Sequence, residues 1–180
     1  MSAQKTRADM EEKYAWAYHS NSTIQQQALL YKTLGHANDS NEFSEVKHAF
    51  WAFIEAYYQI RAHHGKWAEL ITGQKKQKIL LDKWKSAYLT LEQIDAWEAL
   101  ADFRNDNAHK EAMLPDVSLR QVPRATHDGR IRMTHDGKMR TAVVTYLAVS
   151  RDGNDYDLSQ LTSTGLILLR QFIDTFDQVS

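Results

Sequence analysis

Residues that interrupt helices are scarce in this chain. Its 180 residues include only seven glycines and two prolines, the residue types that disfavour a helix interior most. Over most of the first two thirds, apolar side chains recur every three or four residues, which is the period of one helix face. This pattern predicts a bundle of packed helices.

Breaks in the periodic pattern divide it into successive helices. We expect helices over 3–19, from Ser22 or Thr23 to about Gly35, from Ser40 or Asn41 to about Gly65, over 67–72, and from about Lys76 to Tyr88. The helix that ends near Gly65 is apolar on more than one side, which predicts a central position. Thr90 and Gln93 form a capping box that begins a further helix, which continues to roughly Ala112 and stops before Pro115.

Turn and strand signals replace the helical period after Pro115. Residues 126–133 are echoed by residues 134–141, and each copy contains an Asp-Gly pair typical of a hairpin turn. Residues 143–146 favour a strand, and Asp152-Gly153 predicts another turn. Helical spacing then returns in the apolar residues between Leu158 and Phe176.

The predicted fold class is therefore mainly α. It is a helical bundle with a small antiparallel β-hairpin or meander, at about residues 117–151, inserted before the last helix. We expect residues 1–180 to form a single domain, since a chain of this length can bury its own core.

Composition excludes several classes of protein. The chain has no cysteine, which excludes disulfides, cysteine-ligated zinc and thiol catalysis. A net charge of −1 provides no overall field that would attract nucleic acid or a membrane. Residues 1–12 are too polar for a signal peptide, and no apolar run approaches the ~20 residues that span a bilayer. We expect a cytoplasmic protein with no membrane partner.

The residues with the clearest chemical potential lie at 104–109, Arg-Asn-Asp-Asn-Ala-His. Arg104 stays protonated, whereas His109 titrates near neutral pH. Arg104 shares the apolar stripe of its helix with Trp97 and Ala101, so its guanidinium needs a partner or an interface. Asn105 lies four residues before His109, close enough to hydrogen-bond the imidazole.

Arg104 and His109 point in different directions on an ideal helix. Five residues turn a side chain by about 140°, so one helix brings the two groups together only through the reach of arginine or a distortion. Two copies that meet across an isologous interface bring them together more naturally. We therefore expect a homodimer.

Arg104-Asn105, followed by Ala108-His109, resembles the signature of the HEPN domains. These are helical bundles that carry arginine, four to six residues and then histidine in a late helix, and their dimers juxtapose two copies. Many members are metal-independent ribonucleases, often in toxin–antitoxin or antiphage systems. The resemblance covers about residues 42–112 and the last helix.

The resemblance implies three catalytic residues. His109 would act as general base or acid, Arg104 would stabilise the charge of the transition state, and Asn105 would orient His109 or bind the phosphate. RNA would be cleaved to 2′,3′-cyclic phosphate and 5′-hydroxyl ends without a metal or another cofactor. A cognate antitoxin or regulatory protein would be a further partner.

The predicted β-insertion is basic. Between residues 117 and 151, seven basic residues stand against Asp128 and Asp136, a local charge of +5. Such a patch suits an RNA backbone, but charged residues also protect the edges of a solvated hairpin. The candidate substrate-binding residues are Arg120, Arg124, Arg130, Arg132, Lys138 and Arg140; Arg151 completes the basic set.

One other interpretation of the motif remains open. Arg104 and His109 can be an ion-paired arginine and a surface histidine of a non-catalytic helical dimer, which binds a protein partner or nucleic acid. His63 and His64 are adjacent and have no acidic residue at ligand spacing, so we expect no metal site there.

Overall fold

The computed structural model describes residues 2–34, 40–72, 77–109, 115–126, 128–151 and 154–179. Its elements, in chain order, are α1 (Ala3–Leu34), α2 (Ser40–Thr72), α3 (Gln77–Tyr88), α4 (Leu91–His109), β1 (Asp116–Pro123), β2 (Thr141–Arg151), β3 (Asn154–Asp157) and α5 (Leu158–Thr175). The prediction of a mainly helical fold with a small antiparallel sheet before the last helix is confirmed.

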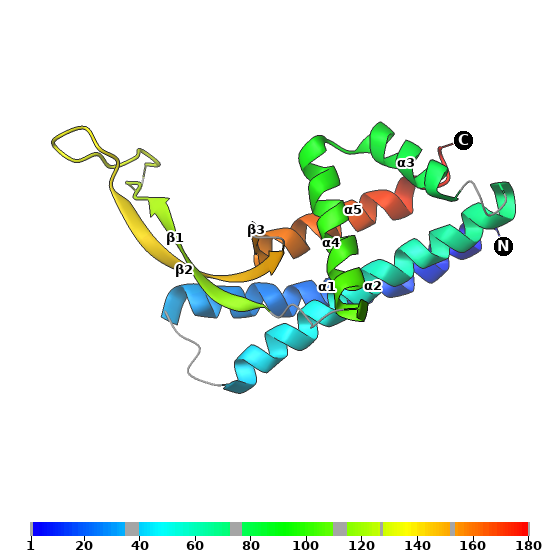
Figure 1. Ribbon diagram of the computed structural model, residues 1–180, viewed down its shortest axis with the longest axis horizontal. Coiled ribbons are helices and arrows are strands. Elements are labelled where there is room, and N and C mark those ends of the chain that lie inside the picture. The colour runs from blue at the N-terminus through cyan, green and yellow to red at the C-terminus, as the bar shows by residue number, and fades with distance from the viewer. Residues whose placement is uncertain are drawn as a thin grey trace.

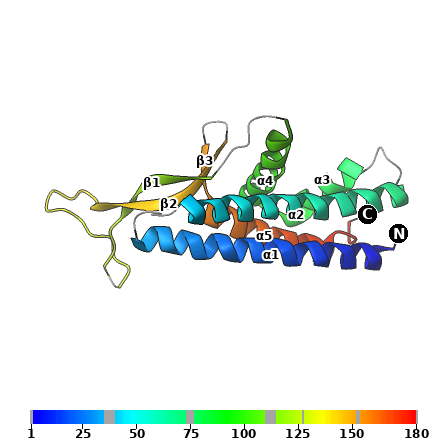
Figure 2. The ribbon, with the colours of Figure 1, turned by 90° about the horizontal axis from the view of Figure 1, so that it is seen from below.

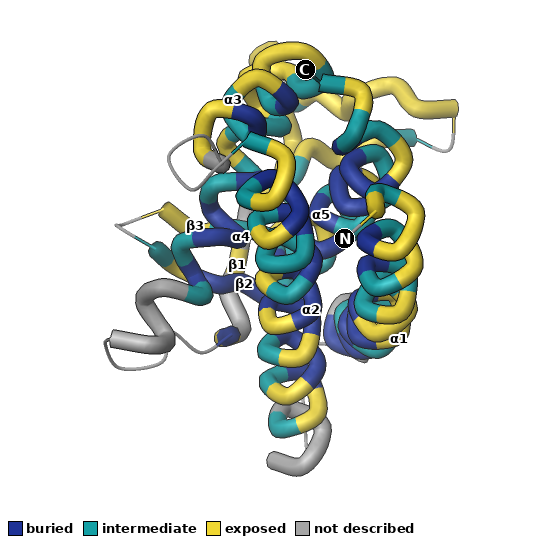
Figure 3. The backbone as a smooth tube through the Cα atoms, turned by 90° about the vertical axis from the view of Figure 1, so that its right-hand side faces the viewer, coloured by how far each residue is buried: buried dark blue, intermediate teal, exposed yellow. Residues whose placement is uncertain are grey.

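The long helices define the shape of the molecule. α1, α2 and α5 run along its long axis, and α4 crosses them (Figures 1 and 2). A ribbon formed by β1 and β2 extends from one end of the bundle, while α3 and both chain termini lie at the other end (Figure 1). Buried positions on α1, α2 and α5 face one another between the helices (Figure 3). None of the described helices has the length and apolarity needed to cross a bilayer.

Aromatic side chains fill the core where α4 crosses the other helices. Trp84 and Trp97 are fully buried, and their rings lie 4.7 Å and 5.3 Å from the ring of Phe172 on α5. The Tyr57 hydroxyl donates a hydrogen bond of 2.8 Å to the Trp97 carbonyl. These contacts hold α4 against α2 and α5. Trp67 is buried as well.

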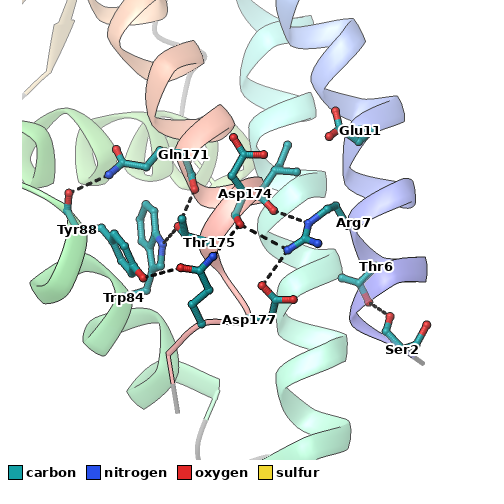
Figure 4. A network of polar contacts seen from close by, with 12 residues as sticks. Ser2, Thr6, Arg7, Glu11, Trp84, Tyr88, Gln171, Asp174, Thr175 and Asp177 are labelled. Carbon is teal, nitrogen blue, oxygen red and sulfur yellow. Dashed lines mark hydrogen bonds and ion pairs between the residues drawn. The ribbon is translucent and has the colours of Figure 1, made fainter.

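Polar contacts fasten both ends of the chain to this core (Figure 4). The Arg7 Nε donates to the Ile173 carbonyl (3.0 Å), and its Nη2 pairs with Asp177 (2.8 Å). The Trp84 indole donates to the Thr175 hydroxyl at 2.9 Å. The start of α1 and the body of α3 are therefore both bonded to the end of α5.

α1 is continuous, so the predicted break near residues 20–22 is wrong. The Asn21 side chain accepts hydrogen bonds from Gln25 (3.1 Å) and from Thr162 of α5 (2.9 Å). The Thr23 hydroxyl donates back to the His19 carbonyl. These polar side chains bond to a neighbouring helix or to the preceding turn instead of capping a new helix.

α2 is also a single helix, and the predicted end near Gly65 is wrong. A glycine inside a helix costs about 1 kcal/mol relative to alanine. Beyond Gly65, Trp67 and Ala68 are buried, and the Trp67 ring lies 4.8 Å from that of Phe176. Burial of a tryptophan side chain is worth more than the glycine costs, so the helix continues to Thr72.

The start of α4 was predicted correctly. The Thr90 hydroxyl accepts from the Gln93 amide (3.3 Å), and the Gln93 side chain accepts from the Thr90 amide (2.9 Å), which is the reciprocal bonding of a capping box. The predicted extension of α4 from His109 to Ala112 lies outside the described residues. The same is true of the turn predicted at 152–153.

The strands form an antiparallel sheet in the order β1-β2-β3. Asp116 pairs with Ala148 at one end of the β1–β2 ladder, and Pro123 pairs with Thr141 at the other. β3 leads directly into α5, where the Asp157 carboxylate accepts from the Gln160 amide as N-cap. The strand predicted at 143–146 therefore lies within the longer β2.

Candidate functional site

Arg104 is held by α2. It lies half-buried near the end of α4, and its guanidinium carbon is 3.8 Å from the centre of the Tyr58 ring, well inside the range of a cation–π contact. Among the described side chains, no carboxylate forms an ion pair with Arg104. The expected need for a partner is met by an aromatic face, which leaves the N–H groups at the edge of the guanidinium able to bind an anion.

One acidic neighbour of Arg104 on the same helix is already paired. Asp102 accepts from Arg151 at the end of β2, with 2.6 Å between the oxygen and the nitrogen. This ion pair joins α4 to the sheet and balances the carboxylate that lies two residues before Arg104. Arg151 is therefore part of the junction between sheet and helix, and its charge does not add to a free basic surface.

Tyr58 also lines a groove of about 830 Å³ between α2, α3 and α4. Lys85 forms ion pairs with Asp82 (2.8 Å) and Glu98 (2.6 Å) across it. Three further cationic side chains line the groove: Arg61 and Lys66 from α2, and Lys78 from α3. Arg104 thus lies beside a charged groove, stacked on one of its walls.

His64 lines the same groove and was not recognised as significant from the sequence. It is only 3% exposed, and its ring contacts the rings of Trp67 and Phe172. Burial, and then the nearby charge of Arg61, lower the His64 pKa from 6.5 to about 4. The position follows Ile60 by one helical turn on the buried stripe of α2, which is the signal that would have identified a buried histidine.

The other two predicted catalytic residues are described only in their backbone. α4 is helical through His109, so Arg104 and His109 belong to one helix, about 140° apart. The side chains of Asn105 and His109, and the hydrogen bond predicted between them, lie outside the described residues.

Five of the six predicted substrate-binding residues lie at the tip of the sheet, which we define as residues 124–140. Arg130 pairs with Asp128 and Lys138 pairs with Asp136, at matching positions of the two sequence copies. Arg124, Arg132 and Arg140 are exposed. The side chain of Arg120, on β1, lies outside the described residues.

The tip is remote from Arg104 within one chain. Arg151, at one end of β2, contacts α4 through Asp102, whereas Thr141, at the other end, adjoins the tip. A strand rises about 3.3 Å per residue, so the length of β2 separates the two by about 33 Å. In Figure 1 the tip lies at the free end of the β1–β2 ribbon, while α4 lies within the helical bundle. The structure therefore does not bring the basic tip beside the Arg104 motif of the same chain.

In the described part of the chain, no three histidine, aspartate or glutamate side chains are grouped so that they would hold a metal ion. No protein-family model, curated protein or solved structure matches this chain.

Proposed function

We propose that the protein is a metal-independent endoribonuclease of the HEPN type. The observation that supports this most is the Arg104 guanidinium, stacked 3.8 Å from the centre of the Tyr58 ring without a carboxylate partner among the described residues. A cation held in this way is oriented by an aromatic face and keeps its hydrogen-bond donors for an anion. Its helix also carries Asn105 and His109.

In the proposed reaction, the ribose 2′-oxygen attacks the adjacent phosphorus while the bond from phosphorus to the 5′-oxygen breaks. One His109 imidazole removes the 2′-hydroxyl proton, and a second, protonated His109 gives a proton to the leaving 5′-oxygen. Arg104 stabilises the negative charge that builds on the phosphoryl oxygens. Asn105 orients the imidazole or binds the phosphate. The products are a 2′,3′-cyclic phosphate and a 5′-hydroxyl.

A homodimer supplies the two imidazoles in this proposal. Arg104 and His109 diverge by about 140° on their own helix, so a site built from both is completed by the partner subunit. We propose that the dimer acts in the cytoplasm as a toxin or antiphage defence effector. A cognate antitoxin or regulatory protein would hold it inactive.

The test is cleavage of a fluorescently labelled RNA in EDTA by the wild type and the His109→Ala variant. The substitution removes both imidazoles of the dimer, and loss of even one general acid or base lowers the rate by about 10²–10⁴-fold. We therefore expect a loss of at least that size, and cyclic phosphate ends in the wild-type products. His48→Ala is the matched control, because His48 is an exposed histidine of α2. Equal cleavage by the wild type and His109→Ala would refute the proposal.

Shared sites are tested by mixing the wild type with the inactive His109→Ala variant under conditions in which subunits exchange. A mixed dimer holds only one His109 imidazole, so a site that needs both imidazoles is inactive in it. At constant total protein, activity should therefore fall as the square of the wild-type fraction. A linear fall in mixtures shown to exchange subunits would refute the shared site.

A second candidate function has one observation in its favour. Leu119 and Val143, on the β1–β2 ribbon, are 67% and 61% exposed, and exposed apolar side chains that cluster on a surface are typical of binding sites for other proteins. A non-catalytic dimer would use them to bind a partner. Growth arrest on expression of the wild type but not of His109→Ala favours the enzyme over this alternative.

A further inference from the structure

Three arginines of the tip occupy equivalent positions in a closed ring of backbone hydrogen bonds. The Arg132 amide donates to the Arg124 carbonyl (2.7 Å), the Arg140 amide to the Arg132 carbonyl (2.8 Å), and the Arg124 amide to the Arg140 carbonyl (2.8 Å). Each arginine donates to one neighbour and accepts from the other. We call these three residues the arginine junction.

Three antiparallel stems meet at the arginine junction. Their first pairs are Ala125 with Ile131, Met133 with Met139, and Thr141 with Pro123. Each pair joins the residue after one arginine to the residue before the next, and the arginines are spaced eight residues apart. The backbone around the ring therefore has approximate threefold symmetry.

The two hairpins that grow from the ring have the same internal structure. Gly129 and Gly137, with φ of 82° and 76°, donate to the carbonyls of Thr126 and Thr134. In each turn the threonine hydroxyl donates to the aspartate, and the pKa of Asp128 and of Asp136 is lowered chiefly by that hydrogen bond. The turns thus keep their carboxylates ionised.

The charges of the tip divide into two groups. The ionised Asp128 and Asp136 pair with Arg130 and Lys138, which follow them in the turns. In the described part of the tip, no carboxylate pairs with an arginine of the junction. The tip has five cationic residues and two carboxylates, so its surplus charge of +3 resides on the junction.

The ring gathers the backbones of the three arginines at one point of the tip, because each is hydrogen-bonded to both of the others. A long, exposed cationic side chain extends from each of these three positions. Each guanidinium presents a planar fork of donors that suits a phosphate oxygen. A terminal phosphate has three equivalent oxygens around its ester bond, whereas a phosphodiester offers only two.

We propose that the arginine junction is a binding site for a terminal phosphate group of a nucleic acid. The threefold ring and its unpaired charge carry the phosphate specificity, while the assignment to nucleic acid rests on the proposed ribonuclease function. The tip contains no phenylalanine, tyrosine or tryptophan, the side chains on which bases usually stack. Recognition is therefore of the phosphate and not of the base sequence.

The test is fluorescence anisotropy with two short single-stranded RNAs that differ only at the 5′ end, one phosphorylated and one with a hydroxyl. The His109→Ala protein is used so that cleavage cannot interfere. We expect the phosphorylated RNA to bind on the order of tenfold more tightly, because hydrogen bonds to a charged phosphate are stronger than those to a neutral hydroxyl. Inorganic phosphate should compete for the difference.

Two double variants provide a matched comparison. Arg132→Gln with Arg140→Gln removes two junction charges, and Arg130→Gln with Lys138→Gln removes two turn charges from the same tip. All four side chains are exposed, and circular dichroism checks that the fold is kept. The junction variant should lose the preference for the 5′-phosphate, and the turn variant should keep it.

Equal loss of the phosphate preference in both double variants would overturn the site. A parent protein that neither distinguishes the two RNAs nor binds vesicles with phosphomonoester lipid headgroups would overturn it as well. Binding of such vesicles without a preference between the RNAs would overturn only the assignment to nucleic acid. Failure of the ribonuclease proposal is a separate outcome: the wild-type protein leaves RNA uncut while the preference for the 5′-phosphate persists.

Discussion

The helical body and the tip of the sheet are ordered by different forces. In the body, Trp84, Trp97 and Phe172 are completely buried, so apolar burial and aromatic contact dominate. In the tip, none of the described residues is buried, and its order comes from backbone hydrogen bonds and turn geometry. We therefore expect the body to determine global stability, while changes in the tip affect only local order and binding.

Truncation of a core aromatic tests this contrast most strongly. Phe172→Ala should lower the free energy of unfolding by about 3–5 kcal/mol, because it leaves a cavity between α3, α4 and α5. Ile131→Ala, on the exposed tip, should change it by less than about 0.5 kcal/mol. Urea denaturation measures both. Comparable losses in the two variants would refute the distinction.

The buried histidine should make the stability of the body depend on pH. The His64 pKa is about 4 in the folded protein and 6.5 in the reference state, so the unfolded chain binds a proton that the folded chain excludes. The free energy of unfolding is therefore not reduced by His64 above pH 6.5, and it decreases as the pH falls from 6.5 to about 4. The loss would be about 3 kcal/mol.

Denaturation of His64→Leu across this pH range checks the prediction. The variant should lack this component of the pH dependence, whereas His19→Leu should retain it, because His19 is exposed. An unchanged pH profile in His64→Leu would contradict the assignment.

The contact between α4 and α5 should not tolerate an added methyl group. A Cβ at Gly165 would lie 2.5 Å from Leu100 Cδ1 and 3.1 Å from the Phe53 ring. Overpacking of this kind costs about 1–3 kcal/mol, so Gly165→Ala should lower the melting temperature. Leu100→Ala should be less destabilising in the Gly165→Ala background than in the wild type, as a double-mutant cycle would show. Strict additivity would argue against a direct clash.

The smallest expected effect is local. Gly129→Ala and Gly137→Ala would force an L-residue to φ of 82° and 76°, at a cost of roughly 1–2 kcal/mol each. Because the tip adds little to the core, global unfolding should change little. Amide hydrogen exchange in the tip should become faster, while exchange in α4 stays the same. Slower folding of the body or faster exchange in α4 would show that the two regions are coupled.

Local signals predicted several elements correctly. The capping box at Thr90 and Gln93, the Asp-Gly turns at 128–129 and 136–137, and the apolar spacing of α5 each depend on residues close together in sequence. The same local reasoning was wrong for the breaks in α1 and α2. In α1, Asn21 bonds to Thr162, which lies 141 positions further along the chain, and no local pattern contains that partner.

Periodicity and turn chemistry in the amino-acid order alone thus determined the mainly helical class, the inserted sheet and the repeated turns, because these depend on neighbouring backbone and side-chain preferences. Only the tertiary structure decided that Arg104 stacks on Tyr58, that His64 is buried in a charged groove, and that the three junction arginines close a ring. Each of these depends on contacts between residues that are not neighbours in the chain, and local sequence patterns do not specify such contacts.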